Sequence, residues 1–222
     1  MSTAWRGEAL GMPAWVQRLT GQFGKPSGLV GELAGWLMAK TNKANAWVVE
    51  LVDVRPGDRV LEVGFGPGVA ISLAAAQAGD GRVVGVEVSE VMLRQAQRRN
   101  RQAIQAGRVE LRLGDVHALP FADGAFTRAY SLHSLYFWRS LDVALAELHR
   151  VLTAGGRLVL AGRLHRPEAS AFDPSRYGLK DADVRRIAEA LEEAGFQPPR
   201  QEVRELGRET VIAFVAERPP LS

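Results

Sequence analysis

The chain contains no cysteine, which excludes disulfide bonds, thiolate-ligated zinc sites and cysteine nucleophiles. Lysine is scarce, at residues 25, 40, 43 and 180 only, so arginine carries nearly all of the positive charge. The formal net charge of the 222 residues is only +3. The arginines clustered between Arg94 and Arg112 are typical of a solvated helix face rather than an anion-binding patch. No nucleic-acid partner is therefore predicted.

Long apolar runs are also absent. The uncharged run over residues 63–79 is interrupted by Gly64, Gly66, Pro67 and Gly68, whereas a membrane-spanning helix needs about 20 mostly apolar residues. The N-terminus lacks a basic segment followed by an apolar core and a cleavage site, so no signal peptide is predicted. The sequence therefore predicts a cytoplasmic protein.

What is present is an ordinary globular composition, 46% hydrophobic and 24% charged, with most of the tryptophan near the start of the chain. An apolar stripe of helical spacing covers residues 29–37. We predict a helical lid over residues 1–55 and a second domain over residues 56–222. The lid would cover one edge of that domain or a partner subunit, so a homodimer is one expectation. Transient membrane contact through tryptophan is another.

From residue 59 onward, short apolar strands alternate with helices. Strands are predicted over residues 59–63, 82–86, 109–113, 126–131 and 157–161. Five strand–helix units predict a parallel sheet with helices on both faces, which is a doubly wound α/β fold. Two further strands, over residues 201–204 and 210–216, form a predicted hairpin that adds an antiparallel strand to the sheet.

Helix boundaries follow from the residues that flank the apolar periods. Ser89, Ser140 and Asp181 are predicted N-caps, because their side-chain oxygens can accept from backbone N–H groups of the first turn. The helix that follows Ser89 is predicted to end at Gly107. The pair Gly155 and Gly156 is predicted to end the helix that follows Ser140.

Ligands of parallel α/β sheets bind at the carboxyl ends of the strands. The first strand contains Glu62 and leads into a turn with Gly64, Phe65, Gly66 and Gly68. Alternating glycines let the backbone approach a ligand where a Cβ would clash, and the helix N-terminus that follows favours anions. The spacing departs from the dinucleotide fingerprint G-x-G-x-x-G. A tight turn without a ligand is the alternative.

Two carboxylates follow the next two strands. Glu87 closes the second strand, where a carboxylate can accept hydrogen bonds from both hydroxyls of a ribose. Asp115 comes after Gly114 at the end of the third strand and can accept from an exocyclic amine. The alternatives are an exposed strand-end glutamate and an aspartate that caps a turn.

Together these turns resemble the class I S-adenosylmethionine (SAM)-dependent methyltransferases, in particular the bacterial group that acts on small molecules and lipid headgroups. The resemblance covers about residues 48–216 and rests on Val60–Gly68, Val86–Ser89, Gly114–Phe121 and Glu147–Leu158. It implies SAM as cofactor, with S-adenosylhomocysteine as product. It also implies a Rossmann-like seven-stranded sheet that is mostly parallel and ends in an antiparallel strand.

The resemblance further implies a role for each residue of the three turns. The glycines would pass beside the methionine portion and Glu62 would orient their turn, while Glu87 would hold the ribose. Asp115 would hold the adenine amine, between apolar contacts from Val88 and Val116. The predicted cofactor site also includes Phe65, Gly114 and Ser131.

The fourth strand leads into residues 130–138, which would face the reacting group. His133 is the titratable side chain there in a useful pKa range and is the candidate general base. Tyr136, Phe137 and Trp138 would wall the acceptor pocket, and His165 would line it from the end of the fifth strand. The alternatives are a histidine that holds a backbone carbonyl and aromatic side chains that are ordinary core.

The sequence thus predicts an enzyme that moves a methyl group from SAM to O, N or C of a small organic acceptor without a metal ion. The fourth strand lacks the [ND]-P-P-[YF] motif of amide- and exocyclic-nitrogen methyltransferases, and the aspartate of metal-dependent catechol enzymes. A lipid or quinone methyltransferase and a non-catalytic SAM-binding module are the open alternatives. A nicotinamide-dependent oxidoreductase is a further one.

Overall fold

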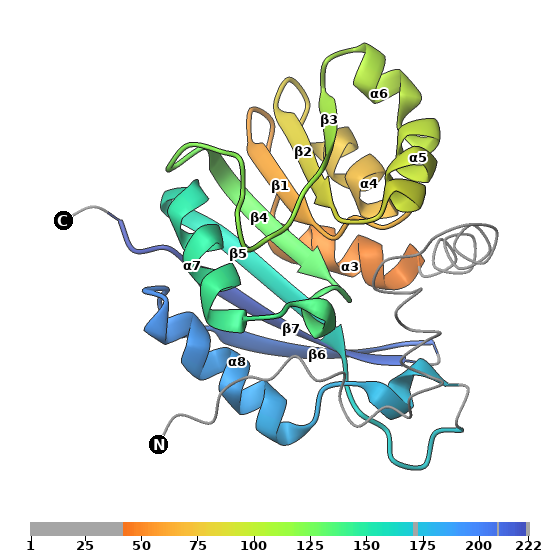
Figure 1. Cartoon of the computed structure of the whole chain (residues 1–222), viewed down its shortest axis with the longest axis vertical. Helices are drawn as coiled ribbons and strands as arrows, with labels where there is room; N and C mark the ends of the chain where they lie inside the picture. The colour runs from red at the N-terminus through yellow and green to blue at the C-terminus, as the bar shows by residue number, and fades with distance from the viewer. Residues whose placement is uncertain (1–41, 171–172, 208, 221–222) are drawn as a thin grey trace.

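The structure is a computed structural model that describes residues 42–170, 173–207 and 209–220. Strands and helices alternate along most of this part of the chain (Figure 1). The elements are α3 (Asn42–Val52), β1 (Arg59–Val63), α4 (Val69–Gln77), β2 (Arg82–Glu87), α5 (Glu90–Arg99), α6 (Arg101–Gln105), β3 (Val109–Leu113), β4 (Phe126–Leu132), η1 (Leu135–Phe137), α7 (Leu141–Val151), β5 (Leu152–Arg163), η2 (Pro174–Tyr177), α8 (Asp181–Glu193), β6 (Arg200–Leu206) and β7 (Glu209–Glu217).

The strands form one seven-stranded sheet in the order β3-β2-β1-β4-β5-β7-β6. The first five strands pair in parallel, and β7 pairs antiparallel with both β5 and β6. This arrangement confirms the predicted Rossmann-like sheet and its antiparallel C-terminal strand. Because β1 pairs with both β2 and β4, the carboxyl ends of these strands and of β3 lie along the same edge of the sheet.

Each face of the sheet carries its own apolar core, because successive side chains of a strand point to opposite faces. Val60 and Tyr130 belong to the core beneath α3 and α4, whereas Leu61 and Ala129 belong to the core beneath α7 and α8. Figure 1 shows these two groups of helices on opposite sides of the sheet. The two cores hold the central strands in register, and this fixes the positions of the carboxyl ends of those strands.

Helix α3 packs directly on the sheet. Its residues Trp47, Val48, Val49 and Val52 are almost fully buried, and the helix contacts α4, β4, β5 and β7. This part of the predicted N-terminal extension therefore shares a core with the sheet. Residues 1–41, which include the predicted helical stripe, lie outside the described residues. Among the helices that the structure describes, none has the length and apolarity needed to cross a bilayer.

Ser89 and Ser140 cap their helices as predicted, accepting from Met92 N at 3.4 Å and from Val143 N at 3.3 Å. The predicted single helix after Ser89 is wrong, because it divides at Asn100 into α5 and α6. The Asn100 side chain donates to the carbonyls of Gly68 and Ala96, at 3.0 and 2.9 Å, and this ties the break to the glycine turn.

Two further boundary predictions are wrong. Strand β5 begins at Leu152, so Gly155 and Gly156 lie inside the strand rather than ending a helix. The pairing of Leu152 with Phe126, followed by a register shift, places the glycine pair in a strand irregularity. The N-cap of α8 is Lys180 rather than the residue after it.

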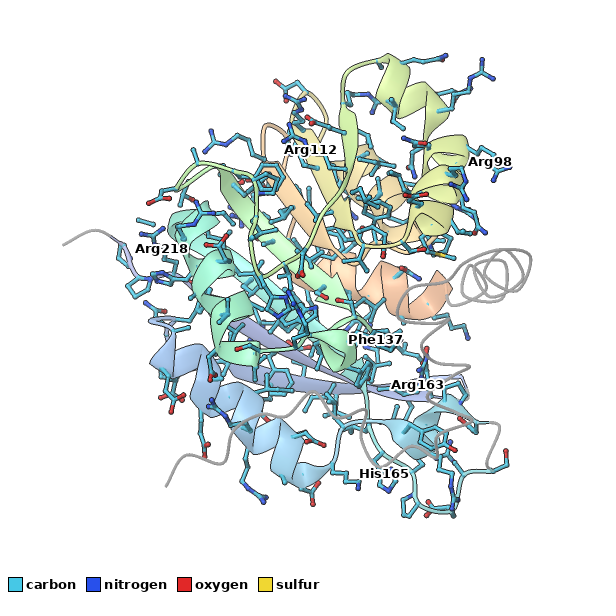
Figure 2. All side chains as sticks on the ribbon, in the orientation of Figure 1. Arg98, Arg112, Phe137, Arg163, His165 and Arg218 are labelled. Atoms are coloured by element: carbon cyan, nitrogen blue, oxygen red, sulfur yellow. The ribbon has the colours of Figure 1, made fainter. Side chains whose placement is uncertain are left out.

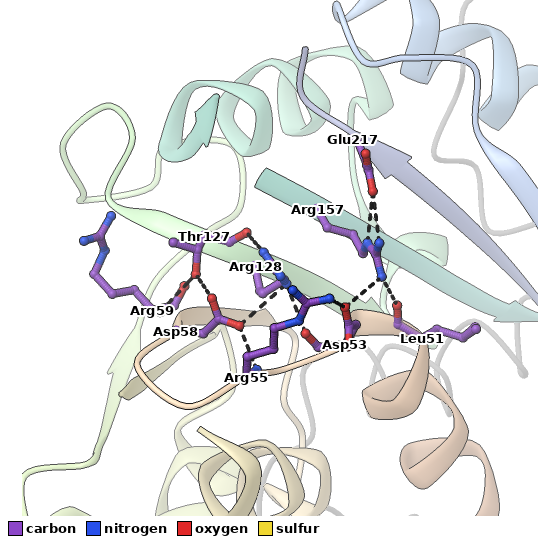
Figure 3. Close-up of polar contacts among 9 residues, drawn as sticks. All are labelled: Leu51, Asp53, Arg55, Asp58, Arg59, Thr127, Arg128, Arg157 and Glu217. Atoms are coloured by element: carbon purple, nitrogen blue, oxygen red, sulfur yellow. Dashed lines mark hydrogen bonds and ion pairs between the residues drawn. The ribbon is translucent and has the colours of Figure 1, made fainter. Parts of the chain in front are cut away.

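A polar network joins the segments at the amino ends of the strands (Figure 3). Thr127 Oγ1 donates to Asp58 Oδ1 at 2.7 Å, which links β4 to the turn before β1. Arg157, near the start of the regular part of β5, pairs with Glu217 at 3.0 Å and donates to the Leu51 carbonyl at 3.3 Å. This network fixes the sheet edge opposite the carboxyl ends.

Candidate active site

The turn after β1 depends on its glycines for different reasons. Gly64, Gly66 and Gly68 have φ angles of 72°, 51° and 75°, a region that side chains rarely adopt. A Cβ on Gly64 would lie 2.4 Å from Ser134 Cβ, and one on Gly68 would lie 2.7 Å from Ala96 Cβ. A Cβ on Gly66 would meet nothing within 4 Å. The turn therefore packs tightly at its ends and faces open space at Gly66.

Glu87 joins the end of β2 to this turn. Its side chain is largely buried, Oε2 accepts from Gly66 N and Oε1 accepts from Ser89 N, each at 3.0 Å. Burial raises the pKa of Glu87, and the backbone donors oppose this by favouring the ionised form. Each carboxylate oxygen retains capacity for a second donor. Glu87 can therefore accept hydroxyl groups of a ligand beside Gly66.

The end of β3 is fastened to the same place, since Gly114 N donates to the Glu87 carbonyl at 2.9 Å. Asp115 Oδ1 accepts from His117 N at 3.0 Å and lies 2.5 Å from His117 Nδ1. Its Oδ2 accepts from Arg139 Nη2 at 2.7 Å. Burial raises the pKa of Asp115, but the His117 hydrogen bonds outweigh it and the net shift is downward. A ligand amine that donates to the Asp115 carboxylate would do so alongside His117 and Arg139.

The two valines predicted to contact adenine differ in exposure. Val88 is 39% exposed at the end of β2, whereas Val116 is 5% exposed and belongs to the core. Phe65 is also buried, and its ring lies where a Cβ on Gly85 would project. Val88 therefore offers an exposed apolar surface. The Phe65 ring packs against β2, so only the backbone of Phe65 is part of the turn.

Glu62 lies beneath the turn and is 3% exposed. The Tyr130 hydroxyl donates to its Oε2 at 2.8 Å. Burial raises the pKa of Glu62 to about 8, against the lowering effect of the Tyr130 hydrogen bond. A carboxyl with this pKa is largely protonated at neutral pH, so it can donate as well as accept.

The chain turns sharply after β4. Ser131 and Ser134 share a hydrogen bond between their hydroxyls, and Ser134 also donates to the Val63 carbonyl at 3.2 Å. His133 stands between them with a φ of 58°, and its backbone N–H donates to the Ala161 carbonyl at 2.9 Å. The turn after β4 is thereby held against the turn after β1. The positive φ of His133 is uncommon for a residue other than glycine.

The His133 ring lies among charged groups from β5 and β7. Its Nε2 is 3.5 Å from Glu209 Oε2 and 3.5 Å from Arg163 Nη2. Its Nδ1 is buried and has no hydrogen-bond partner among the described residues. Burial and the positive charge of Arg163 lower the pKa of His133, and Glu209 opposes them. The ring is therefore neutral at pH 7 and able to accept a proton.

The aromatic residues after His133 have separate environments. The Tyr136 hydroxyl donates to the Arg163 carbonyl at 3.2 Å, Phe137 is 41% exposed, and Trp138 is 4% exposed in the core. The His165 backbone N–H donates to the Leu179 carbonyl at 2.9 Å, and its Nδ1 is buried without a partner in the described part of the chain. Figure 2 labels Phe137, Arg163 and His165 on these segments.

Glu209 and Arg163 were not predicted as site residues. Arg163 ends β5, which pairs directly with β4, whereas Glu209 reaches His133 only through the antiparallel return of β7. Their signal in the sequence is weak, since each is a single charged residue at a strand end.

SAM is the cofactor that the sequence resemblance implies, and the residues at the edge of the sheet fit it. Open space at Gly66, free acceptor capacity on buried Glu87 and the exposed apolar surface of Val88 suit a nucleoside with adjacent hydroxyls. Glu87 would hold the ribose, and the backbone of the glycine turn would pass beside the remainder of the molecule.

Comparison with known proteins agrees with this geometry. Residues 61–160 match the family model described as a methyltransferase domain. The uncharacterized methyltransferase YdaC of Bacillus subtilis is 25% identical over 84% of this chain and 98% of that protein. The demethylmenaquinone methyltransferase of Symbiobacterium thermophilum is 38% identical over 47% of this chain and 42% of that protein.

The chain spans only 36% and 44% of the length of two further curated relatives that it matches. A crystal structure of a SAM-dependent methyltransferase from Aquifex aeolicus has the same fold, with a TM-score of 0.66 at 20% identity. That match covers 78% of this chain and 89% of the other. Residues 61–160 therefore form a methyltransferase domain, and the sheet around them has the fold of SAM-dependent methyltransferases.

Proposed function

We propose that the protein transfers a methyl group from SAM to an O, N or C atom of a small organic acceptor, without a metal ion. The observation that supports this most directly is the junction at the edge of the sheet. There the β1 turn contacts the ends of β2 and β4, through Gly66 with Glu87 and through Gly64 with Ser134. A neutral, mostly buried histidine follows β4 at the same junction.

The bound cofactor supplies an electrophilic methyl group on a sulfonium. Glu87 accepts hydrogen bonds from the ribose hydroxyls. Asp115 accepts a hydrogen bond from the adenine amine, through lone pairs of its carboxylate that His117 and Arg139 do not use. Val88 covers one face of the base. Because the positions of these groups are fixed by backbone hydrogen bonds, they hold the ligand without rearranging.

His133 accepts the proton that an O–H or N–H acceptor loses as its new bond to carbon forms. A neutral imidazole is the protonation state needed for this role, and burial maintains it at pH 7. Phe137 supplies exposed aromatic surface for the acceptor, and Tyr136 and His165 complete the predicted lining.

A lipid or quinone acceptor is the second candidate. The relative that is named for its action on demethylmenaquinone favours it. The predicted tryptophan-rich lid, which would contact a membrane or a greasy acceptor, lies outside the described residues. A module that binds SAM without transferring its methyl group is the third candidate, because a fold does not determine an activity.

A labelling partition separates these candidates. The protein is incubated with methyl-labelled SAM and an extract of its native host, and label is then measured in lipid, in small aqueous molecules and in macromolecules. We expect label in the small aqueous fraction, and mass spectrometry of that fraction identifies the acceptor. Label in the lipid fraction would favour the second candidate instead.

His133→Gln tests the base. We expect intact S-adenosylhomocysteine binding and a loss of label transfer of about 100-fold, the usual lower contribution of a general base. His149→Gln is the matched control, because His149 lies on α7 and packs against Phe196, with ring centroids 5.1 Å apart. Absence of transfer by the native protein in every fraction, despite binding of S-adenosylhomocysteine, would favour the binding module.

A further inference from the structure

Three strands bring one charged or titratable side chain each to a single cluster. His133 follows β4, Arg163 ends β5 and Glu209 begins β7. Arg163 Nε donates to Glu209 Oε2 at 2.5 Å, and His133 Nε2 is 3.5 Å from that same oxygen. The side chains of His133, Arg163 and Glu209 are only 16%, 18% and 12% exposed. This cluster is therefore shielded from solvent, where a charge–imidazole contact is strong.

The contacts around His133 bear on which ring nitrogen carries the proton. If Nδ1 carried it, a buried N–H would have no acceptor among the described residues, which is rare and costly in folded proteins. If Nε2 carries it, an oxygen of the ionised Glu209 carboxylate lies 3.5 Å away as an available acceptor. Hydrogen bonds to a charged acceptor are the stronger kind, so the Nε2–H tautomer is favoured.

Arg163 acts against this tautomer, because its Nη2 also lies 3.5 Å from His133 Nε2 and can donate to an unprotonated nitrogen. The carboxylate of Glu209 decides between the two arrangements. The contact with His133 and the positive charge of Arg163 lower the pKa of Glu209 to about 2 despite its burial, so Glu209 is ionised. Arg163 and Glu209 are the charged groups that act on His133, and the Tyr136 hydroxyl binds the Arg163 backbone beside them.

We propose that Glu209 is a positioning residue that holds His133 in the Nε2–H tautomer. The buried, unpartnered Nδ1 is then the nitrogen that takes the proton from the methyl-accepting substrate. This inference rests on the proposed function, in which His133 is the general base. When the proton arrives at Nδ1, the ring becomes an imidazolium whose charge faces Glu209. The same carboxylate then stabilises the cation, as a second partner of a catalytic histidine does.

The tautomer is measured directly by two-bond proton–nitrogen correlation spectra of the histidine rings in the full chain. The sequence has four histidines, and His133→Gln identifies the signals of His133. In the native protein we expect the proton on Nε2 and an unprotonated Nδ1. In Glu209→Leu we expect that preference to be lost, because Arg163 can then donate to Nε2. A proton on Nδ1 in the native protein, or an unchanged tautomer in Glu209→Leu, would overturn the proposal.

Glu209→Gln and Glu217→Gln separate positioning from packing. Glu209→Gln retains an oxygen acceptor of similar size, so the Nε2–H tautomer persists while the loss of charge lowers the pKa of His133. Glu217→Gln removes the Arg157 partner on the same two strands at their far end, and we expect it to leave the ring signals unchanged. A tautomer change in Glu217→Gln would point to general loosening of the sheet and overturn the assignment to Glu209.

Initial rates of label transfer complete the test. Glu209→Leu is expected to lower kcat at least about tenfold, part of the general-base contribution, with little change in KM for SAM and with partial rescue in Glu209→Gln. If His133→Gln transfers label at the native rate, the base role fails and the catalytic role of Glu209 fails with it. If His133→Gln is inactive but Glu209→Leu keeps both the native tautomer and the native rate, only the proposal for Glu209 is overturned.

Discussion

The side chain of Ser134 occupies the space into which a side chain at residue 64 would project. A Cβ on Gly64 would lie 2.4 Å from Ser134 Cβ and 2.8 Å from its hydroxyl, which is closer than real Cβ atoms approach. Ser134 in turn donates to the Val63 carbonyl. The first and fourth strand-end turns are therefore built against each other, and the cofactor turn and His133 share one support.

Gly64→Ala is expected to destabilise the protein by about 2–5 kcal/mol, since the φ of 72° is unfavourable for alanine and the methyl group overlaps Ser134. Gly107→Ala is the matched control, because Gly107 has a φ of 70° and no atom within 4 Å of its Cβ position. It should cost only about 1–2 kcal/mol. Urea denaturation measures both.

Addition of Ser134→Gly to Gly64→Ala should recover the difference between the two alanine variants. Equal losses in Gly64→Ala and Gly107→Ala would contradict the packing of the two turns that is described above.

Glu87→Ala is expected to weaken S-adenosylhomocysteine binding by about 1–3 kcal/mol, the usual effect of removing the partner of a buried polar group. Isothermal titration calorimetry measures the affinity at a temperature where each variant is folded. Glu90→Ala is the control, because Glu90 is a strongly exposed residue in the first turn of α5, three residues after Glu87 in the sequence but outside the site. Native affinity in Glu87→Ala would refute the assignment of the ribose contact.

Much of this site could be predicted because its signals are local. The glycine turn and Glu87 lie at strand ends, and their residue types are those that the chemistry needs. The cluster around His133 could not be predicted, since Glu209 reaches it only through the antiparallel return of β7. Gly155 and Gly156 gave a wrong helix end because the register of β5 with its neighbours outweighs a local glycine signal.

The sequence also did not predict in which direction the aromatic side chains near the site point. Phe65 and Trp138 both lie near predicted binding turns, yet each is buried in one of the two cores. Position along the chain placed them beside the site, whereas the pleat of the adjacent strands decides which way each ring points.

Arg150 holds the segment that follows Asp115. Its Nη1 donates to the Phe121 carbonyl at 2.7 Å and its Nη2 to the Leu119 carbonyl at 3.0 Å, while it also pairs with Glu147. Arg150→Lys should therefore destabilise the protein by about 2–4 kcal/mol, because an ammonium cannot reproduce this fork of donors. Thermal and urea unfolding measure the loss.

Arg186→Lys is the control for Arg150→Lys. Among the described residues, Arg186 pairs with two side chains that are more than half exposed, Asp142 and Glu193, and such pairs contribute about 1 kcal/mol or less. Similar losses in the two lysine variants would show that the clamp on the loop carbonyls is not the source of the effect.

Glu62 and Tyr130 form a buried pair beneath the glycine turn, and burial raises the pKa of Glu62 from 4.5 to about 8. The folded protein therefore binds a proton at Glu62 between these pH values that the unfolded chain does not. By linkage, this contribution to stability is present below about pH 4.5 and is lost as the pH rises through 8.

Glu62→Gln removes that titration while keeping an oxygen that can accept from Tyr130. We expect the unfolding free energy of the native protein, relative to the variant, to fall by a few kcal/mol between pH 5 and pH 9, since each pKa unit corresponds to about 1.4 kcal/mol. Urea denaturation of both proteins across this range measures the difference, and the titration of Glu87 cancels because both proteins contain it. A difference that is independent of pH would show that Glu62 is ionised in the folded protein throughout, and that solvent or a neighbouring donor reaches its carboxylate.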